Sequence, residues 1–326
     1  MDFQPTEDQQ HLRAGVRDLL AGRYGREALR ASVDAAARGG AGGAAGGAGA
    51  GGAAGVDRAL WRELGGAGFF ALRLPESEGG VGLGLPEAVL VFEEAGRALV
   101  PGPLVATHLA AGVVPGAADG TAVVTAFDLD GPLVAHLGDA DAVLGAAAVP
   151  AGEPVRSVDP LTPLHRVAAA GDVSAYRATG ALLTAALQLG SALRTVELAV
   201  RYAGEREQFG QPIGAFQAVK HLCARMLVRA EVARTAVYAA AVTGDPGEGA
   251  AAKLLADEAA VQGARDCLQV HGGMGFTWEA DVHLHLKRAW VRAEQWRTAA
   301  QAQELLAEEL LAEALLAEEL PATAAP

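Results

Sequence analysis

A proline-free stretch of about thirty residues, 178–207, constrains the fold of this chain more than any other feature. Its sequence, ATGALLTAALQLGSALRTVELAVRYAGERE, consists mainly of good helix formers. Helices in globular proteins usually have about three or four turns, so a helix of this length must pack against neighbours along much of its surface. Between Phe216 and Ala240, small and apolar side chains recur at alternating spacings of three and four. That spacing is typical of a tightly packed bundle, and we expect long packed helices from about residue 173.

Charge and cysteine content exclude several classes of function. The formal net charge of -13 would repel a phosphate backbone, so we expect no nucleic-acid partner. Cys223 and Cys267 give neither a disulfide framework nor a metal-binding spacing, which fits a reducing cytoplasm, and Cys223 falls in the packed seam rather than at a reactive site. The N-terminus is acidic and no apolar run reaches the roughly 20 residues that span a bilayer, so neither export nor membrane insertion is expected.

The first 114 residues predict an N-terminal helical domain. Thr6 and Gln9 form a capping-box pattern that opens an amphipathic helix. Helical patterns follow at 56–66, 85–98 and 103–113. Residues 38–55 are almost entirely Gly and Ala without the Gly-Lys-Ser/Thr ending of a phosphate loop, so we interpret them as a flexible linker.

A different pattern begins near residue 115. Short β-rich runs such as TAVVTAFDL and GPLVAHL alternate with Gly, Pro and Asp turns, which predicts a small β domain of about five or six strands at 115–172. At the other end, the acidic tail at 304–326 repeats its leucines about every five residues. That step spreads them around a helix, so we expect a solvated tail helix that docks only in part.

Two polar, glycine-rich segments interrupt the long helices and are the candidate site. They are RYAGEREQFGQPIGAFQAVKH at 201–221 and QVHGGMGFTWEADVHLHLKRA at 269–289. Arg206 offers a bidentate fork for a phosphate, and Gln217 and Gln269 offer donors and acceptors. Gly272 and Gly273 allow a ligand to approach the backbone. On spacing alone, the alternative is that Arg206 is a surface charge and that the glycines only turn the chain.

Together the two segments resemble the acyl-CoA dehydrogenase family, and MDFQPTEDQQ at the start and DPLTPLHRVA at 159–168 are similar to that family too. The resemblance implies a mostly α fold: an N-terminal helical domain, a middle β-barrel and a C-terminal four-helix domain, here 173–303. It also implies FAD and oxidation of the Cα–Cβ bond of an acyl-CoA thioester, in which a carboxylate removes the α-proton.

The same resemblance assigns the candidate residues to a cofactor clamp. Arg206, Phe209 and Gln217, with the segment from Gln269 through Gly272 and Gly273, would hold the ADP half of an FAD bound mainly by the neighbouring subunit. The polar turns between the helices would then be offered across a subunit interface.

The chain departs from the family pattern in two places. Its β domain is a truncated β-barrel without the Thr-Glu-Pro and Gly-Ser-Asp signatures that line the flavin ring. Counting from the motifs places Trp296 and Gly180 at the two positions where subfamilies carry the catalytic carboxylate. Glu294 is nearby but is interpreted as a solvated helix charge, so no catalytic residue is assigned. A bulky indole near 296 would also fill part of the acyl space.

These features favour one component of an α2β2 heterotetrameric acyl-CoA dehydrogenase, completed by a homologous full-length subunit. By resemblance, the substrate is an acyl-CoA, the acceptor is an electron-transfer flavoprotein or similar protein, and the pathway is associated with steroid side-chain degradation. One alternative is a self-sufficient homo-oligomeric flavin dehydrogenase with Glu294 or another carboxylate as base. Another is a structural subunit that binds no flavin.

The histidines of the second segment were weighed as ligands. His283 and His285 lack a third ligand at suitable spacing, so no metal site is predicted. His271 precedes the glycine pair and is expected either to touch the cofactor or to pack as an interface histidine.

Overall fold

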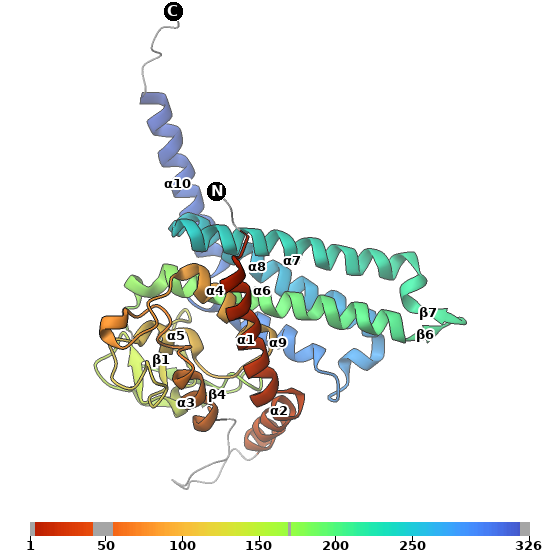
Figure 1. Ribbon diagram of the computed structural model, residues 1–326, viewed down its shortest axis with the longest axis horizontal. Helices are drawn as coiled ribbons and strands as arrows, with labels where there is room; N and C mark the ends of the chain where they lie inside the picture. The colour runs from red at the N-terminus through yellow and green to blue at the C-terminus, as the bar shows by residue number, and fades with distance from the viewer. Residues whose placement is uncertain (1–3, 42–54, 169–170, 320–326) are drawn as a thin grey trace, which may run out of the picture.

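The computed structural model describes residues 4–41, 55–168 and 171–319, which form two helical regions and, between them in the chain, a small β region that lies at the lower left in Figure 1. The N-terminal helices are α1 (Glu7–Arg23), α2 (Arg26–Ala41), α3 (Arg58–Gly66), α4 (Leu85–Arg97) and α5 (Leu104–Ala110), with a 3-10 turn η1 (Glu76–Glu78). The C-terminal helices are α6 (Ser174–Glu205), α7 (Gln217–Thr243), α8 (Pro246–His271), α9 (Val282–Glu294) and α10 (Ala299–Glu319). None of the described helices is long and apolar enough to cross a membrane.

The first helix begins as the sequence predicts. The Thr6 side chain accepts a hydrogen bond from the Gln9 backbone at 3.3 Å, and the Gln9 side chain accepts one from the Thr6 backbone at 2.9 Å. The predicted linker at 38–55 starts too early, because α2 continues through Ala41. Alanine and the helical turn already formed carry α2 into the Gly/Ala segment. Residues 42–54 of the predicted linker lie outside the described part of the chain.

The β region consists of two small sheets. Its strands are β1 (Val124–Ala126), β2 (Leu133–Ala135), β3 (Ala142–Leu144), β4 (Gly152–Val155) and β5 (Leu164–Val167), with a 3-10 turn η2 (Leu137–Asp139). β1 pairs in parallel with β3, while β2, β5 and β4 form an antiparallel sheet in that order. The reduced β domain that the sequence predicts is confirmed, and its five short strands form two small sheets.

The long helices lie side by side, with the hairpin of β6 (Glu207–Gln208) and β7 (Gln211–Pro212) at one end of the array and α10 projecting at the other (Figure 1). The proline-free stretch forms most of α6, which is 32 residues long. Asp245 caps α8 by accepting a hydrogen bond from the Glu248 backbone at 2.8 Å. In α10, Ala302 is buried but Leu310, Leu311 and Leu315 are exposed, so the tail helix docks only through its first turns.

The N-terminal region joins the bundle where α4 crosses α6 in close contact. A Cβ placed on Gly96 of α4 or on Gly190 of α6 would come closer than 3.0 Å to backbone atoms of the other helix. Only glycine permits this approach, and it buries Glu93 and Glu94 of α4. Tyr238 donates a hydrogen bond to Glu93 at 2.6 Å, and Arg17 makes a bidentate pair with Glu94 at 2.6 and 2.8 Å.

A buried ion pair joins α9 to the β region. Arg288 pairs with Asp159, and its guanidinium also donates to the Val100 carbonyl at 3.2 Å. Thr162 donates a further hydrogen bond to Asp159 at 2.6 Å. Burial alone would raise the pKa of Asp159, but the charge of Arg288 and the hydrogen bonds that the carboxylate accepts hold it below its usual value. The pair therefore stabilises the fold above that usual value and loses its effect as the pH falls through the lowered pKa.

We expect Arg288→Met to lower the free energy of unfolding by about 3–5 kcal/mol, because it leaves the buried Asp159 carboxylate without its partner. Asp159→Asn with Arg288→Met should recover part of the loss, since neither charge remains. Urea denaturation measures both effects. Arg62→Met, at an exposed position of α3, is the control, and equal stability of the Arg288 variant and this control would contradict the role of the pair.

Candidate functional site

The two glycine-rich segments meet at one end of the long helices (Figure 1). After α6, the hairpin of β6 (Glu207–Gln208) and β7 (Gln211–Pro212) and the turn η3 (Ile213–Ala215) lead into α7. After α8, the turn η4 (Gly272–Phe276) leads towards α9. The rings of Tyr202 on α6 and His271 at the end of α8 stack with their centroids 4.1 Å apart. This contact holds the two predicted motifs against each other.

The side chains predicted to form the clamp are free to bind a ligand. Arg206, Gln217 and Gln269 are exposed, and none makes a side-chain hydrogen bond or ion pair with the described residues. A Cβ placed on Gly272 or Gly273 would meet no described atom within 4 Å, so the backbone there is open. A forked cation, two amides and an open glycine turn fit the ADP half of a dinucleotide.

Phe209 is the most exposed aromatic side chain of this end. Its side chain is 93% exposed, and its backbone has a φ of +54°, in the left-handed region. It contacts Phe216 edge to face, with ring centroids 6.0 Å apart. Nearby in the second segment, Phe276 is 75% exposed. Large apolar side chains displayed in this way are typical of a surface that a partner covers.

The histidines of the second segment make contacts within the protein. His271 is half-buried and donates from Nδ1 to the Cys267 carbonyl at 2.8 Å. His285 is buried, with Nδ1 2.7 Å from the Ser191 hydroxyl, and His283 stacks on Trp278. Within the described residues, no group of three or more His, Cys, Asp or Glu side chains is arranged to hold a metal ion.

Burial also explains why the two cysteine thiols are unreactive. It raises the pKa of Cys267 to about 12, and it raises the pKa of Cys223, which packs against the core. Neither thiol is therefore a nucleophile at neutral pH, in line with the place of Cys223 in the predicted helical seam.

The two positions expected to carry a catalytic carboxylate lie against each other. Gly180 is buried in α6, and the buried indole of Trp296 packs directly on it. A Cβ placed on Gly180 would come closer than 3.0 Å to three atoms of the Trp296 ring. Because the indole occupies this space, neither a carboxylate from α6 nor an acyl chain can enter it. Glu294 is exposed at the end of α9 and is not directed into this contact.

The backbone after α9 is fixed so that Trp296 points inward. The Trp296 amide donates to the Asp128 carbonyl, and Gln295 donates from its side chain to Asp128 Oδ2 at 2.8 Å. Leu129 and Gln295 also form an isolated antiparallel bridge. Trp296 has a φ of +62°, a conformation that a bulky residue adopts only when its surroundings impose it. The loop after β1 therefore determines where the indole lies.

Asp128 is a half-buried acid that the sequence analysis missed. Its Oδ1 is inaccessible to solvent and has no hydrogen-bond partner among the described residues. Burial raises its pKa to about 7, and the hydrogen bond from Gln295 opposes that shift. The adjoining cavity, lined also by His136 and Arg292, measures about 30 Å³, which suits a water molecule rather than a thioester or a flavin ring. In the sequence, Asp128 lies in the run FDLD, and this run predicts only a turn.

Two family models match this arrangement of helices and site. The model of the acyl-CoA dehydrogenase N-terminal domain matches residues 6–124, and the model of the C-terminal domain matches residues 178–312. Acyl-CoA dehydrogenase IpdE2 of Mycobacterium tuberculosis is 37% identical over 309 residues, which cover 87% of this chain and 92% of that protein. IpdE2 of Mycolicibacterium smegmatis is 35% identical, over 81% of this chain and 92% of that protein. The chain belongs to the acyl-CoA dehydrogenase family.

Solved structures share the fold. The ChsE4–ChsE5 complex of Mycobacterium tuberculosis has a chain with a TM-score of 0.77 and 24% identity, covering 99% of this chain and 100% of that chain. A chain of the Tcur3481–Tcur3483 steroid ACAD has a TM-score of 0.78 and 23% identity, covering 95% and 99%. Butyryl-CoA dehydrogenase of Megasphaera elsdenii has a TM-score of 0.76 and 18% identity, covering 95% and 100%. These values confirm the family fold expected from the two motifs.

We expect Gly180→Ala to lower the free energy of unfolding by about 1–3 kcal/mol through overlap with Trp296. In an open helix the same change would be favourable by about 1 kcal/mol. Gly15→Ala on α1 is the matched control, because its added Cβ would meet nothing within 4 Å. Adding Trp296→Leu should remove the penalty of Gly180→Ala in a double-mutant cycle measured by denaturation. Additive effects would mean that the indole does not fill this space.

Proposed function

We infer that this chain is the clamp-donating, non-catalytic subunit of an FAD-dependent acyl-CoA dehydrogenase, which oxidises the Cα–Cβ bond of an acyl-CoA thioester only when a homologous full-length subunit completes it. One observation carries the proposal. The clamp end is open and unpaired, while the position of the chain's own catalytic carboxylate is filled by Trp296 packed on Gly180. A self-sufficient enzyme would need both regions to be accessible.

At the clamp, this chain's contribution is binding. Arg206 would place a delocalised positive charge and two parallel donors against the pyrophosphate. Gln217 and Gln269 would pair with the polar edges of the adenosine, and Phe209 would cover it. Gly272 and Gly273 would let the cofactor approach the backbone. FAD, when bound, accepts the β-hydrogen of the substrate as hydride.

The proton chemistry must then come from the partner. Removal of the α-proton requires a base within hydrogen-bonding reach of the substrate, and neither Gly180 nor Trp296 can accept a proton. Asp128 adjoins a cavity of about 30 Å³ that cannot admit a thioester, and Glu294 points to solvent. We therefore assign the flavin ring pocket, the base and most of the acyl-CoA cleft to the partner subunit.

The proposed partner and substrate class rest on the family and its neighbours. Exposed Phe209, Met274 and Phe276 give this end an apolar surface that an adjacent subunit would cover. One structural neighbour belongs to the ChsE4–ChsE5 complex, and another belongs to the Tcur3481–Tcur3483 steroid ACAD. On this support we propose an α2β2 assembly, a steroid side-chain acyl-CoA as substrate, and an electron-transfer flavoprotein or a similar protein as acceptor.

We expect the full chain, purified alone, to be nearly colourless, and to become yellow only in complex with a full-length homologue. The reason is that the cavity next to Trp296, among the described residues, measures about 30 Å³ and is too small for a flavin ring. Flavin absorbance per chain and native mass, measured on the chain alone and on the coexpressed pair, test the assembly. A stoichiometric FAD spectrum from a homo-oligomer of this chain would overturn the proposal.

In the assembled complex, Arg206→Ala should weaken FAD binding by roughly one to two orders of magnitude, because it removes a charged hydrogen-bond donor that contributes about 1.5–3 kcal/mol. Arg62→Ala, at an exposed position of α3, is the control and should leave the affinity unchanged. Equilibrium titration of the apo-complex with FAD, followed by flavin fluorescence, measures the difference. If Arg206→Ala and Gln269→Ala together had no effect, the clamp would be misplaced.

A further inference from the structure

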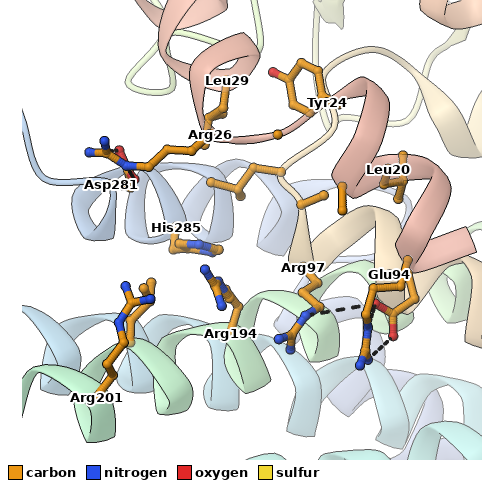
Figure 2. Close-up of a pocket in the computed structure, with 16 residues that line it drawn as sticks. Leu20, Tyr24, Arg26, Leu29, Glu94, Arg97, Arg194, Arg201, Asp281 and His285 are labelled. Carbon is orange, nitrogen blue, oxygen red and sulfur yellow. Dashed lines mark hydrogen bonds and ion pairs between the residues drawn. The ribbon is translucent and has the colours of Figure 1, made fainter. Parts of the chain in front are cut away.

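A second cavity, separate from the clamp, lies beneath the turn between α1 and α2 (Figure 2). It has a volume of about 290 Å³ and is bounded by α4, α6 and the beginning of α9. That volume is close to the lower limit of about 300 Å³ for ligand pockets of proteins. None of the six clamp residues lines it.

The floor of this cavity carries more positive charge than its acids neutralise. Arg97 of α4 and Arg194 of α6 both pair with one carboxylate, that of Glu197. Arg201, two turns further along α6, has no hydrogen bond or ion pair with any described residue. Figure 2 shows Arg97, Arg194 and Arg201 below the cavity. Arg97 and Arg194 thus share one carboxylate and Arg201 has none, which leaves about two uncompensated positive charges.

The neighbouring charges do not cancel this excess. Arg17 makes a bidentate pair with Glu94, and Arg26 pairs with Asp281 at 2.6 Å. Glu94 also lies 4.0 Å from Arg97, but its carboxylate is already engaged by Arg17. His285, at the cavity edge, is neutral at physiological pH, because burial and then the nearby arginines lower its pKa to about 3. A positively charged hollow is notable in a chain with a formal net charge of -13.

The side formed by α1 and α2 carries apolar side chains next to the paired Arg17 and Arg26. Leu20 and Tyr24 at the end of α1 and Leu29 of α2 line the cavity, with Tyr24 and Leu29 near the top and Leu20 at the right in Figure 2. Leu20, Tyr24 and Leu29 are all buried, so they form a fixed wall. The cavity therefore combines a cationic floor with an aliphatic and aromatic roof, which is the lining expected for an amphipathic anion.

We propose that this cavity is a binding site for a small organic phosphate, with the phosphate on Arg97, Arg194 and Arg201 and the organic group against Leu20, Tyr24 and Leu29. Two uncompensated positive charges match a phosphate dianion better than a carboxylate with a single charge. Guanidinium forks bind phosphate oxygens in pairs, which adds direction to the attraction. The proposal does not depend on the proposed dehydrogenase assembly, because it uses no clamp residue.

Isothermal titration calorimetry of the full chain with phenyl phosphate tests the site. Inorganic phosphate and phenol serve as the two half-ligands. We expect phenyl phosphate to bind with one site per chain and at least fivefold more tightly than inorganic phosphate, and phenol not to bind measurably. Arg194→Gln and Arg201→Gln should each weaken phenyl phosphate at least fivefold. Arg62→Gln, on exposed α3, changes net charge equally and should stay within twofold of the unmodified chain.

Several results would overturn the proposal. One is the absence of saturable binding of phenyl phosphate by a chain whose circular dichroism and melting curve show it to be folded. Another is equal weakening by Arg62→Gln and Arg201→Gln, which would reduce the effect to overall charge. Equal affinity for phenyl phosphate and inorganic phosphate would show that the organic group does not contribute to binding. Leu29→Ala tests the apolar wall separately, because it should weaken the binding of phenyl phosphate but not that of inorganic phosphate.

Discussion

The close crossing of α4 and α6 is the constraint on which the rest of the structure depends. At Gly96 and Gly190 the two backbones touch, so the N-terminal helices and the long bundle form one packed unit. The approach buries Glu93 and Glu94, which is tolerated because Tyr238 and Arg17 supply donors to them. The same side of the crossing carries Arg97, so the charge pattern of the second cavity is a consequence of how these helices meet.

A second set of contacts determines where the Trp296 side chain lies. Arg288 and Asp159 attach α9 to the β region through a buried ion pair, and Asp128 then fixes the backbone of the residues that follow α9. With that backbone held, the Trp296 indole has one place to lie, against Gly180. The packing of Trp296 on Gly180 thus depends on contacts from three regions of the structure.

The sequence predicted the features that depend on residues close together in the chain. It did not predict the features that form when distant residues come together on folding. The capping box at Thr6, the long α6 and the two glycine-rich turns depend on residues close in the chain, and each was predicted. Asp128 could not be found, because its unusual pKa comes from burial against segments far along the sequence. The arginines of the second cavity were missed for the same reason: Arg97 and Arg194 come from different helices, and neither belongs to a motif. The reduced β domain was predicted, but the pairing of its strands into two sheets was not, because pairing depends on contacts between segments distant in the chain.

The length of α6 separates the two regions to which the proposed function gives different roles. Gly180 lies near its beginning and Arg206 caps its end, 26 residues later. At 1.5 Å per residue they are about 39 Å apart along the axis, far beyond the reach of any direct interaction. Packing changes that fill the space at Gly180 therefore leave the geometry at Arg206 untouched. In the assembly proposed above, the clamp end can therefore bind a cofactor while the space at Gly180 stays filled.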